Sequence, residues 1–180
     1  MNPTIREVSA ISLLSARNWN AQPREAMISI TGTGDARVVL KRGWRHVLRV
    51  TFDDIEKPRF AWELFSDEHA DRILDFLDKV ETKVDHVVVH CRLGMSRAPA
   101  IARYISQRYD LSNGFDNHMT FNRHVFKVLF VRWRYRVAPG EGFAVNMGWA
   151  RADDPVYSTE LIVAGMRISA GPRRKKGDRT

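Results

Sequence analysis

The stretch VVVHCRLGMSRAPAIARYI, residues 87–105, decides how this chain folds. Its opening run of valines is uninterrupted by polar residues, which is typical of a strand buried on both faces in a parallel sheet. From Arg97 onward the apolar positions recur at helical spacing, and Pro99 stands in the first turn, where proline is tolerated. The stretch therefore predicts a buried strand that ends at His90, a loop over Cys91–Ser96 and a helix that begins at Arg97.

The segments around this stretch alternate between strand and helix patterns. Short β-branched runs separated by Gly, Pro and Asn predict strands. Ser66 is a typical helix N-cap, and the apolar residues that follow it recur at helical spacing, which predicts an amphipathic helix. The order of elements predicts an α/β fold with a central, mostly parallel sheet flanked by helices. Strands are expected over 8–14, 26–30 and 46–52, and helices from Ser66, from Arg97 to a break at 111–114, and from about Asn117 to Val131.

The composition narrows the class of protein. With 44% hydrophobic and 28% charged residues, the chain is not a disordered polyelectrolyte, a collagen-like repeat or a coiled coil. Charged residues interrupt every apolar stretch well short of the roughly 20 residues that span a bilayer, so we expect no membrane span. The first residues, MNPTIREVSA, have no apolar core behind a basic segment, and the expected location is cytoplasmic.

The chain carries an excess of positive charge, with 29 Lys and Arg against 21 acids and a net charge of +8. Such an excess favours anionic partners. The positive charge is concentrated in two stretches. One is the tail GPRRKKGDRT at 171–180, and the other is the segment 123–136, which holds five Lys and Arg side chains and no acid. Nucleic acid is retained as an alternative partner through the basic tail but is not favoured, and a solvated face is the preferred interpretation of 123–136.

The loop over Cys91–Ser96 is expected to bind an anion. At a helix N-terminus several backbone N–H groups lack intrahelical partners and the helix dipole adds partial positive charge, so a phosphate-sized dianion binds there. Gly94 lets the backbone curl inward. The same field stabilises a thiolate at Cys91, the one cysteine of the chain, and Arg97 can offer two parallel N–H donors to phosphoryl oxygens.

The sequence HCRLGMSR, residues 90–97, resembles the signature loop of the cysteine-dependent protein tyrosine phosphatase superfamily. The size of the chain is similar to that of the dual-specificity branch, in particular its small bacterial and phage members, and the similarity runs from about Ala26 to Phe130. The resemblance implies a protein phosphatase, a hydrolase that forms a cysteinyl-phosphate intermediate without a metal or cofactor. It also implies roles for the loop residues: Cys91 is the nucleophile, Arg97 binds the phosphoryl oxygens, His90 supports the loop and the thiolate, and Arg92, Leu93, Gly94, Met95 and Ser96 bind the substrate.

Cleavage of a phosphoester by a thiolate also requires a proton for the departing oxygen, so a carboxylic acid is expected opposite the cysteine. Asp53 and Asp54 follow the predicted strand that ends at Phe52. The residues alone leave each aspartate open as a proton donor or as a loop residue that caps a turn. The resemblance implies that the second of two such aspartates is the donor, so Asp54 is expected to be the general acid and Asp53 a supporting residue.

Two positions beside the cysteine loop bear on catalysis. Ser96 can donate a hydrogen bond to the sulfur or to the loop, although serine at a helix start is more often an N-cap. Ala98 departs from the family, which usually has serine or threonine directly after the arginine, where the hydroxyl helps to expel the thiolate. The departure implies slow hydrolysis of the phosphoenzyme, or, as an alternative, a phospho-binding module with weak catalysis.

A phosphorylated protein carrying phosphotyrosine or phosphoserine/threonine is the expected substrate and partner. Nothing in the loop distinguishes this substrate from an RNA 5′ end or a phosphoinositide, and these stay open. TGTGD at 31–35 resembles a phosphate-binding loop but is expected to be a turn between strands, because no amphipathic helix follows it. Along the chain we expect a phosphatase-like catalytic domain over 1–137, an extension over 138–170 of undetermined structure packed on that domain, and a basic disordered tail over 171–180.

Overall fold

The chain divides into two compact units, Met1–Arg136 and Val137–Thr180. The computed structural model describes residues 3–111, 120–139, 161–163 and 166–168. The first unit contains a four-stranded sheet and the helices that cover it, and the second contains two short antiparallel strands, β5 (Leu161–Val163) and β6 (Met166–Ile168). The extension over 138–170, whose structure the sequence leaves undetermined, therefore contains strands where it is described. No helix among the described residues is long and apolar enough to cross a membrane.

The sheet confirms the predicted α/β fold. Its strands are β1 (Glu7–Ser12), β2 (Glu25–Thr31), β3 (His46–Thr51) and β4 (His86–Cys91), in the order β1-β4-β2-β3. Every neighbouring pair is parallel. The predicted buried strand is the interior strand β4, and its three valines are fully buried. The carboxyl end of β4 leads straight into the loop that carries the candidate site.

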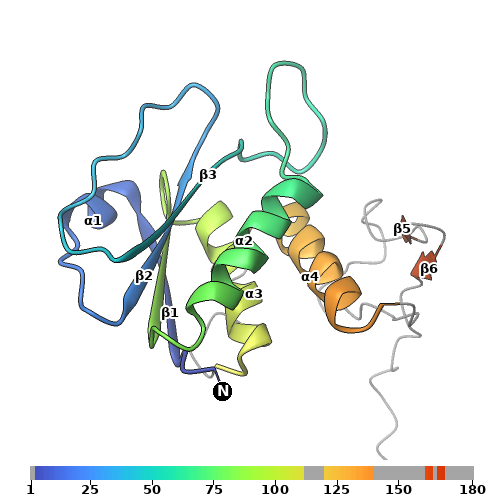
Figure 1. Cartoon of the computed structure of the whole chain (residues 1–180). Helices are drawn as coiled ribbons and strands as arrows, with labels where there is room; N and C mark the ends of the chain where they lie inside the picture. Colours follow the sequence, from blue (N-terminus) through green and yellow to red (C-terminus); the bar gives the residue numbers. More distant parts are fainter. Residues whose placement is uncertain (1–2, 112–119, 140–160, 164–165, 169–180) are drawn as a thin grey trace, which may run out of the picture. The chain divides into compact units, whose positions relative to one another are not determined.

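Helices cover both faces of the sheet. Helices α2 (Asp67–Val80) and α3 (Arg97–Arg108) lie on one side with α4 (Arg123–Val137), and the short α1 (Leu13–Asn18) lies on the other (Figure 1). Helix α2 begins directly after Ser66, as predicted, because the backbone N–H of Ser66 donates to Nδ1 of His69, 3.2 Å away. All of its predicted apolar positions are fully buried, namely Ala70, Ile73, Leu74, Leu77 and Val80.

The predicted strand over 8–14 is wrong at its carboxyl end, where the structure has α1 in place of Leu13 and Leu14. Ser12 is the cause, because its hydroxyl accepts a hydrogen bond from the backbone N–H of Ser15 at 3.2 Å and so caps the new helix. The helix places Ala16, which is fully buried, against Met27 and Val88 on the sheet. A local cap therefore outweighs the strand propensity of two leucines.

The last predicted helix is displaced along the chain. Its expected first residue, Asn117, lies outside the described residues, and Phe121 precedes the helix instead of packing within it. Helix α4 begins at Arg123, and the side-chain oxygen of Asn122 accepts a hydrogen bond from the backbone N–H of Val125 at 3.0 Å. Asn122 is therefore the N-cap, and the helix continues beyond the predicted end at Val131 to Val137.

The turn predicted at TGTGD is confirmed. Gly32 and Asp35 close it twice, because the Asp35 N–H donates to the Gly32 carbonyl at 3.1 Å and the Gly32 N–H donates to the Asp35 carboxylate at 2.7 Å. Gly34 within it has a φ of 81°, in the left-handed region that favours glycine. The turn directs the chain from β2 into the long connection to β3.

Polar side chains tie three strands together at the amino end of the sheet. Glu25 of β2 is buried and accepts hydrogen bonds from the indole N–H of Trp19 and the backbone N–H of Gln22, each at 2.9 Å. Its other oxygen is hydrogen-bonded to His86 Nδ1 at 2.9 Å, and His86 Nε2 to the Ser9 hydroxyl at 2.9 Å. Burial acts to raise the pKa of the Glu25 carboxyl, but its donors hold that pKa below the usual value.

Candidate functional site

The candidate site is the loop between β4 and α3, at the carboxyl end of the sheet. Gly94 in this loop has a φ of 75°, and a Cβ there would lie 2.6 Å from the carbonyl carbon of Ile11 and 2.7 Å from the backbone nitrogen of Ser12. The loop is further joined to this region by the Leu13 N–H, which donates to the Arg92 carbonyl at 3.2 Å. Glycine at this position therefore lets the loop close against the backbone of β1, as the sequence predicts.

Cys91 is the last residue of β4, and 2% of it is exposed. Its Sγ accepts a hydrogen bond from the backbone N–H of Gly94 at 3.2 Å. Four other backbone N–H groups of the loop donate to no protein acceptor among the described residues, and they belong to Arg92, Leu93, Met95 and Ser96. Unpartnered amides next to a sulfur and at a helix N-terminus are donors available to an oxyanion.

Arg97 opens α3 and folds back toward the end of β3. Only 5% of it is exposed, and its guanidinium donates to the Phe52 carbonyl at 2.7 Å and lies over the Phe52 ring, with Cζ 5.9 Å from the ring centroid. The Nε atom is buried without a hydrogen-bond partner in the described part of the chain and lies 3.9 Å from a carboxylate oxygen of Asp54. The structure therefore brings the predicted arginine and the predicted acid together, with guanidinium donors still to be satisfied.

Asp54 is held from two sides through one of its oxygens. Oδ1 accepts a hydrogen bond from the Ser96 hydroxyl at 2.7 Å and another from the Asn122 side-chain amide at 2.9 Å. The other oxygen, Oδ2, is the one near Arg97. The side chain is 38% exposed, so a ligand in the loop has access to it.

Asp53 has a different environment from its neighbour. It is buried, and its two oxygens accept hydrogen bonds from the backbone N–H groups of Thr33 at 3.0 Å and Glu63 at 2.8 Å. Burial acts to raise the pKa of the Asp53 carboxyl, but these hydrogen bonds, with a smaller effect of the Arg97 charge, hold it below the usual value. A carboxylate bound in this way fixes two loops and is a poor proton donor.

His90 lies beneath the loop and is fully buried. Its Nε2 is hydrogen-bonded to the Ser29 hydroxyl at 2.8 Å, while Nδ1 has no partner among the residues that the structure describes. Burial lowers the pKa of His90 to about 4; the backbone of Cys91 acts to raise it, and the charges of Arg49 and Arg97 act to lower it. His90 is therefore neutral at neutral pH, and the side chain it binds is Ser29, a residue the sequence did not single out.

Two residues at the site behave differently from the sequence expectation. Ser96 makes no side-chain cap hydrogen bond, and its hydroxyl donates to Asp54 instead. Asn122 was not a predicted site residue, yet it donates to Asp54 and to the Ile55 carbonyl, and its own backbone N–H donates to the Ser96 carbonyl at 3.2 Å. The one sequence signal that could have found it is an asparagine just before a helical pattern.

Comparisons with known proteins add no assignment, because neither a family model nor a curated protein matches the chain. Within the described residues, no group of three or more His, Cys, Asp and Glu side chains is placed to hold a metal ion. The site is therefore interpreted from its own chemistry. Its parts are a sulfur, a set of unpartnered amides, a buried guanidinium and a partly exposed carboxylic acid.

Proposed function

We propose that the chain is a phosphatase that hydrolyses phosphomonoesters through a cysteinyl-phosphate intermediate. The observation that carries the proposal is the convergence of Cys91, Arg97 and Asp54 on one loop whose amide donors lack protein acceptors. These donors match the equatorial oxygens of a phosphoryl group. Because the loop also resembles the phosphatase signature, phosphorylated protein with phosphotyrosine or phosphoserine/threonine is the first substrate class to test.

The proposed reaction has two steps. In the first, the Cys91 thiolate attacks phosphorus in line, an S–P bond forms, the ester P–O bond breaks, and the departing oxygen takes a proton from Asp54. In the second, water attacks the phosphocysteine, Asp54 takes a proton from that water, and inorganic phosphate and the thiolate are released. Arg97 and the loop amides stabilise the charge on the phosphoryl oxygens in both steps.

A rapid-mixing experiment with a chromogenic aryl phosphate tests the proposal. Ala98 is fully buried and supplies no hydroxyl to assist departure of the thiolate, so we expect the second step to limit turnover. The trace should show a burst of phenol close to one equivalent of enzyme, and Ala98→Ser should raise the steady-state rate. Cys91→Ser should abolish both burst and turnover, by more than about 10³-fold. Turnover that survives Cys91→Ser would contradict the mechanism.

The same experiment separates the alternative, a phospho-binding module, which the missing hydroxyl at Ala98 favours. A binding module retains the phosphoryl group, so it should show a burst, or tight binding of phosphate, followed by no further product between about pH 5 and pH 8. Repeated turnover in that range would exclude the binding module. Asp54→Ala, which leaves the nucleophile in place, should slow the burst and allow capture of bound phosphoprotein.

A further inference from the structure

A run of basic side chains lies between Asp35 and Asp53, where the sequence has five Lys and Arg residues and no acid. We call these five residues the basic strip. None of them forms an ion pair with any described residue, and four are exposed. The members of the basic strip are Arg37, Lys41, Arg42 and Arg45, all in the loop between β2 and β3, and Arg49 on β3.

In the basic segment that stands out in the sequence, 123–136, two of the five basic side chains are by contrast paired with acids on α2. Arg132 lies 2.8 Å from the carboxylate of Asp71 on α2. Arg136 lies 2.6 Å from Asp71 and 2.7 Å from Asp75. The basic strip therefore differs from Arg132 and Arg136, because none of its charges is paired with an acid in the described residues.

The positive charges of the basic strip repel one another. Burial lowers the pKa of Arg49, and the charge of Arg37 lowers it further. At the start of β3, burial lowers the pKa of His46, and Lys83, Lys79 and Arg45 act in the same direction. Like charges held together without a carboxylate between them raise the free energy of the empty surface, and a bound anion reverses that cost.

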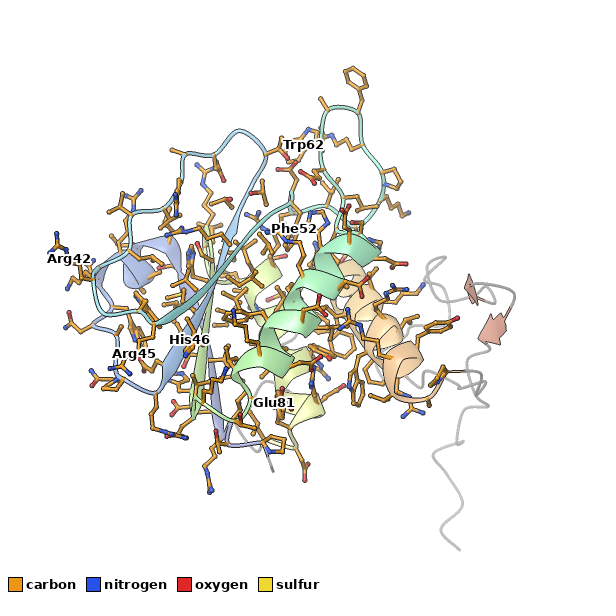
Figure 2. All side chains as sticks on the ribbon, viewed as in Figure 1. Arg42, Arg45, His46, Phe52, Trp62 and Glu81 are labelled. Carbon is orange, nitrogen blue, oxygen red and sulfur yellow. The ribbon has the colours of Figure 1, made fainter. Side chains whose placement is uncertain are left out.

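The basic strip extends from the site to the edge of the molecule. Arg49 donates to the Ser29 hydroxyl at 3.5 Å, and Ser29 is the hydrogen-bond partner of His90, which precedes the nucleophile. At the other end, Arg42 and Arg45 lie on the outer loop (Figure 2). An extended polyanion, with phosphates along its length, fits such a surface better than a single phosphate.

Exposed aromatic side chains lie on the next loop along the chain, apart from Arg42 and Arg45 (Figure 2). The loop after Asp53 carries Phe60, which is 97% exposed, and Trp62, which is 47% exposed and lies under the guanidinium of Arg59 at 5.0 Å. The Asp53 carboxylate accepts a hydrogen bond from the backbone N–H of Thr33 and so connects this loop to the loop between β2 and β3, which carries most of the basic strip. Basic side chains together with exposed aromatic rings are the features by which proteins bind unpaired nucleic acid bases and their backbone.

We propose that the basic strip binds the phosphate backbone of single-stranded nucleic acid, with Phe60 and Trp62 stacking on its bases. An acidic protein segment matches the charge but leaves the aromatic side chains without a role, and a duplex offers no unpaired base to stack. No member of the basic strip is one of the proposed catalytic residues, so the inference goes beyond the proposed phosphatase function and does not depend on it.

Binding of a labelled oligothymidylate of about 12 nucleotides, followed by fluorescence anisotropy, tests the inference on the full-length Cys91→Ser protein. The test variant is Arg42→Gln with Arg45→Gln, two exposed positions without ion pairs in the described residues. Each lost phosphate contact on a single strand reduces the salt slope by about 0.7, so the slope should fall by about 1.4 and the Kd at 0.1 M salt should rise about 25-fold.

A matched control removes the same charge elsewhere. Arg132→Gln with Arg136→Gln should leave the Kd within about twofold of the unsubstituted protein, because those charges are already paired. Arg6→Gln with Arg24→Gln is a second control if the first loses thermal stability. Equal weakening by test and control variants would overturn the inference, since binding would then follow net charge alone.

The aromatic contribution is tested with Phe60→Ala, which removes an almost fully exposed ring and leaves the core unchanged. This substitution should weaken the binding of oligothymidylate several-fold. It should leave the binding of inorganic polyphosphate, which has no bases, unchanged. Tighter binding of the corresponding duplex, or of polyglutamate of equal charge, would overturn the choice of single-stranded nucleic acid. The choice would also be overturned if Phe60→Ala bound the oligonucleotide with the same affinity as the protein that retains Phe60.

Discussion

The two ends of the parallel sheet are built in opposite ways. At the amino end, the hydrogen-bonding atoms of Glu25 and His86 have protein partners, and the nearby Arg24 is joined to Asp85 by two hydrogen bonds. At the carboxyl end, by contrast, the buried Nε of Arg97 and several loop amides have no acceptor in the described residues. Both ends gather polar groups at the edge of the same sheet, but the network around Glu25 and His86 is satisfied, whereas the donors of the loop after β4 are not.

The difference separates stability from binding. A buried donor without a partner costs free energy, and a fold tolerates that cost where a ligand supplies the missing acceptor. At the amino end, Glu25, His86 and Arg24 contribute hydrogen bonds to the folded state, and Glu25 and His86 leave no donor of their own for a ligand. Changes at the amino end should therefore affect the free energy of unfolding, and changes at the carboxyl end should affect activity. The following experiments test that division.

Among variants at the carboxyl end that keep the proposed catalytic side chains, the largest effect is expected from Gly94→Ala. The added Cβ meets the backbone of β1 at 2.6 Å, so the loop must shift, and a displacement of about 1 Å at a reacting group costs about 100-fold in rate. The measurement is kcat/KM with an aryl phosphate. Gly34→Ala is the matched control, because Gly34 has a φ of 81° but no atom within 4 Å of the added Cβ. If both variants lose activity equally, backbone strain and not the close approach is responsible.

At the amino end, Glu25→Ala should lower stability and leave the rate per folded molecule unchanged. It removes the acceptor for Trp19 and Gln22 and the partner of His86, and each unsatisfied group costs about 1 to 3 kcal/mol. We expect a loss of about 3 kcal/mol in the free energy of unfolding, measured by urea denaturation. A fall in kcat/KM without a loss of stability would contradict the division between the two ends.

Asn122→Asp should impair proton donation by Asp54 without removing the helix cap. The aspartate keeps an oxygen for the Val125 N–H but replaces the amide donor to Asp54 with a second carboxylate. For aryl phosphates with poor leaving groups we expect kcat/KM to fall about 30-fold, with a smaller loss for good leaving groups. Asn122→Ser also keeps a helix cap, and its kcat/KM should lie between that of the unsubstituted protein and that of Asn122→Asp. An equal loss for all leaving groups would show that Asn122 acts on the fold and not on the acid.

The smallest effect is the pH dependence contributed by His90. Its pKa is about 4 in the folded protein and about 6.5 in the unfolded chain, so between these values only the unfolded chain binds the proton. Stability should therefore fall as the pH decreases, by about 2 kcal/mol from this residue at pH 5. His90→Gln should remove that part of the slope between about pH 6.5 and pH 5. An unchanged slope in this variant would assign the effect to other groups.

The sequence predicts what is local and misses what depends on distant partners. The buried strand, the loop and the helix from Arg97 are encoded within one short stretch; the helix begins at Arg97 as expected, and the strand continues one residue beyond its expected end, to Cys91. Leu13 and Leu14 were misjudged because a single hydrogen bond from Ser15 to Ser12 decides their conformation. Such a cap is compatible with either interpretation of the sequence.

The environment of the aspartate pair shows the same limit at the site. Asp53 and Asp54 are adjacent in sequence, and what distinguishes them is which groups reach them from elsewhere, namely backbone amides for the first and Asn122 with Ser96 for the second. No local pattern contains that information. Equally, the ion pairs of Arg132 and Arg136 on α4 are formed with acids on α2, so the sequence alone could not show that these two charges are paired.

The arrangement of donors on Asp54 has a stereochemical consequence. Both the Ser96 hydroxyl and the Asn122 amide occupy Oδ1, which leaves Oδ2, the oxygen nearer Arg97, as the position for an acidic hydrogen. With Asp54 as the acid, the hydrogen is transferred from that oxygen alone, so the bridging atom of the substrate has a single direction of approach. Alcohols that cannot present their oxygen along this direction are then poor leaving groups regardless of their acidity.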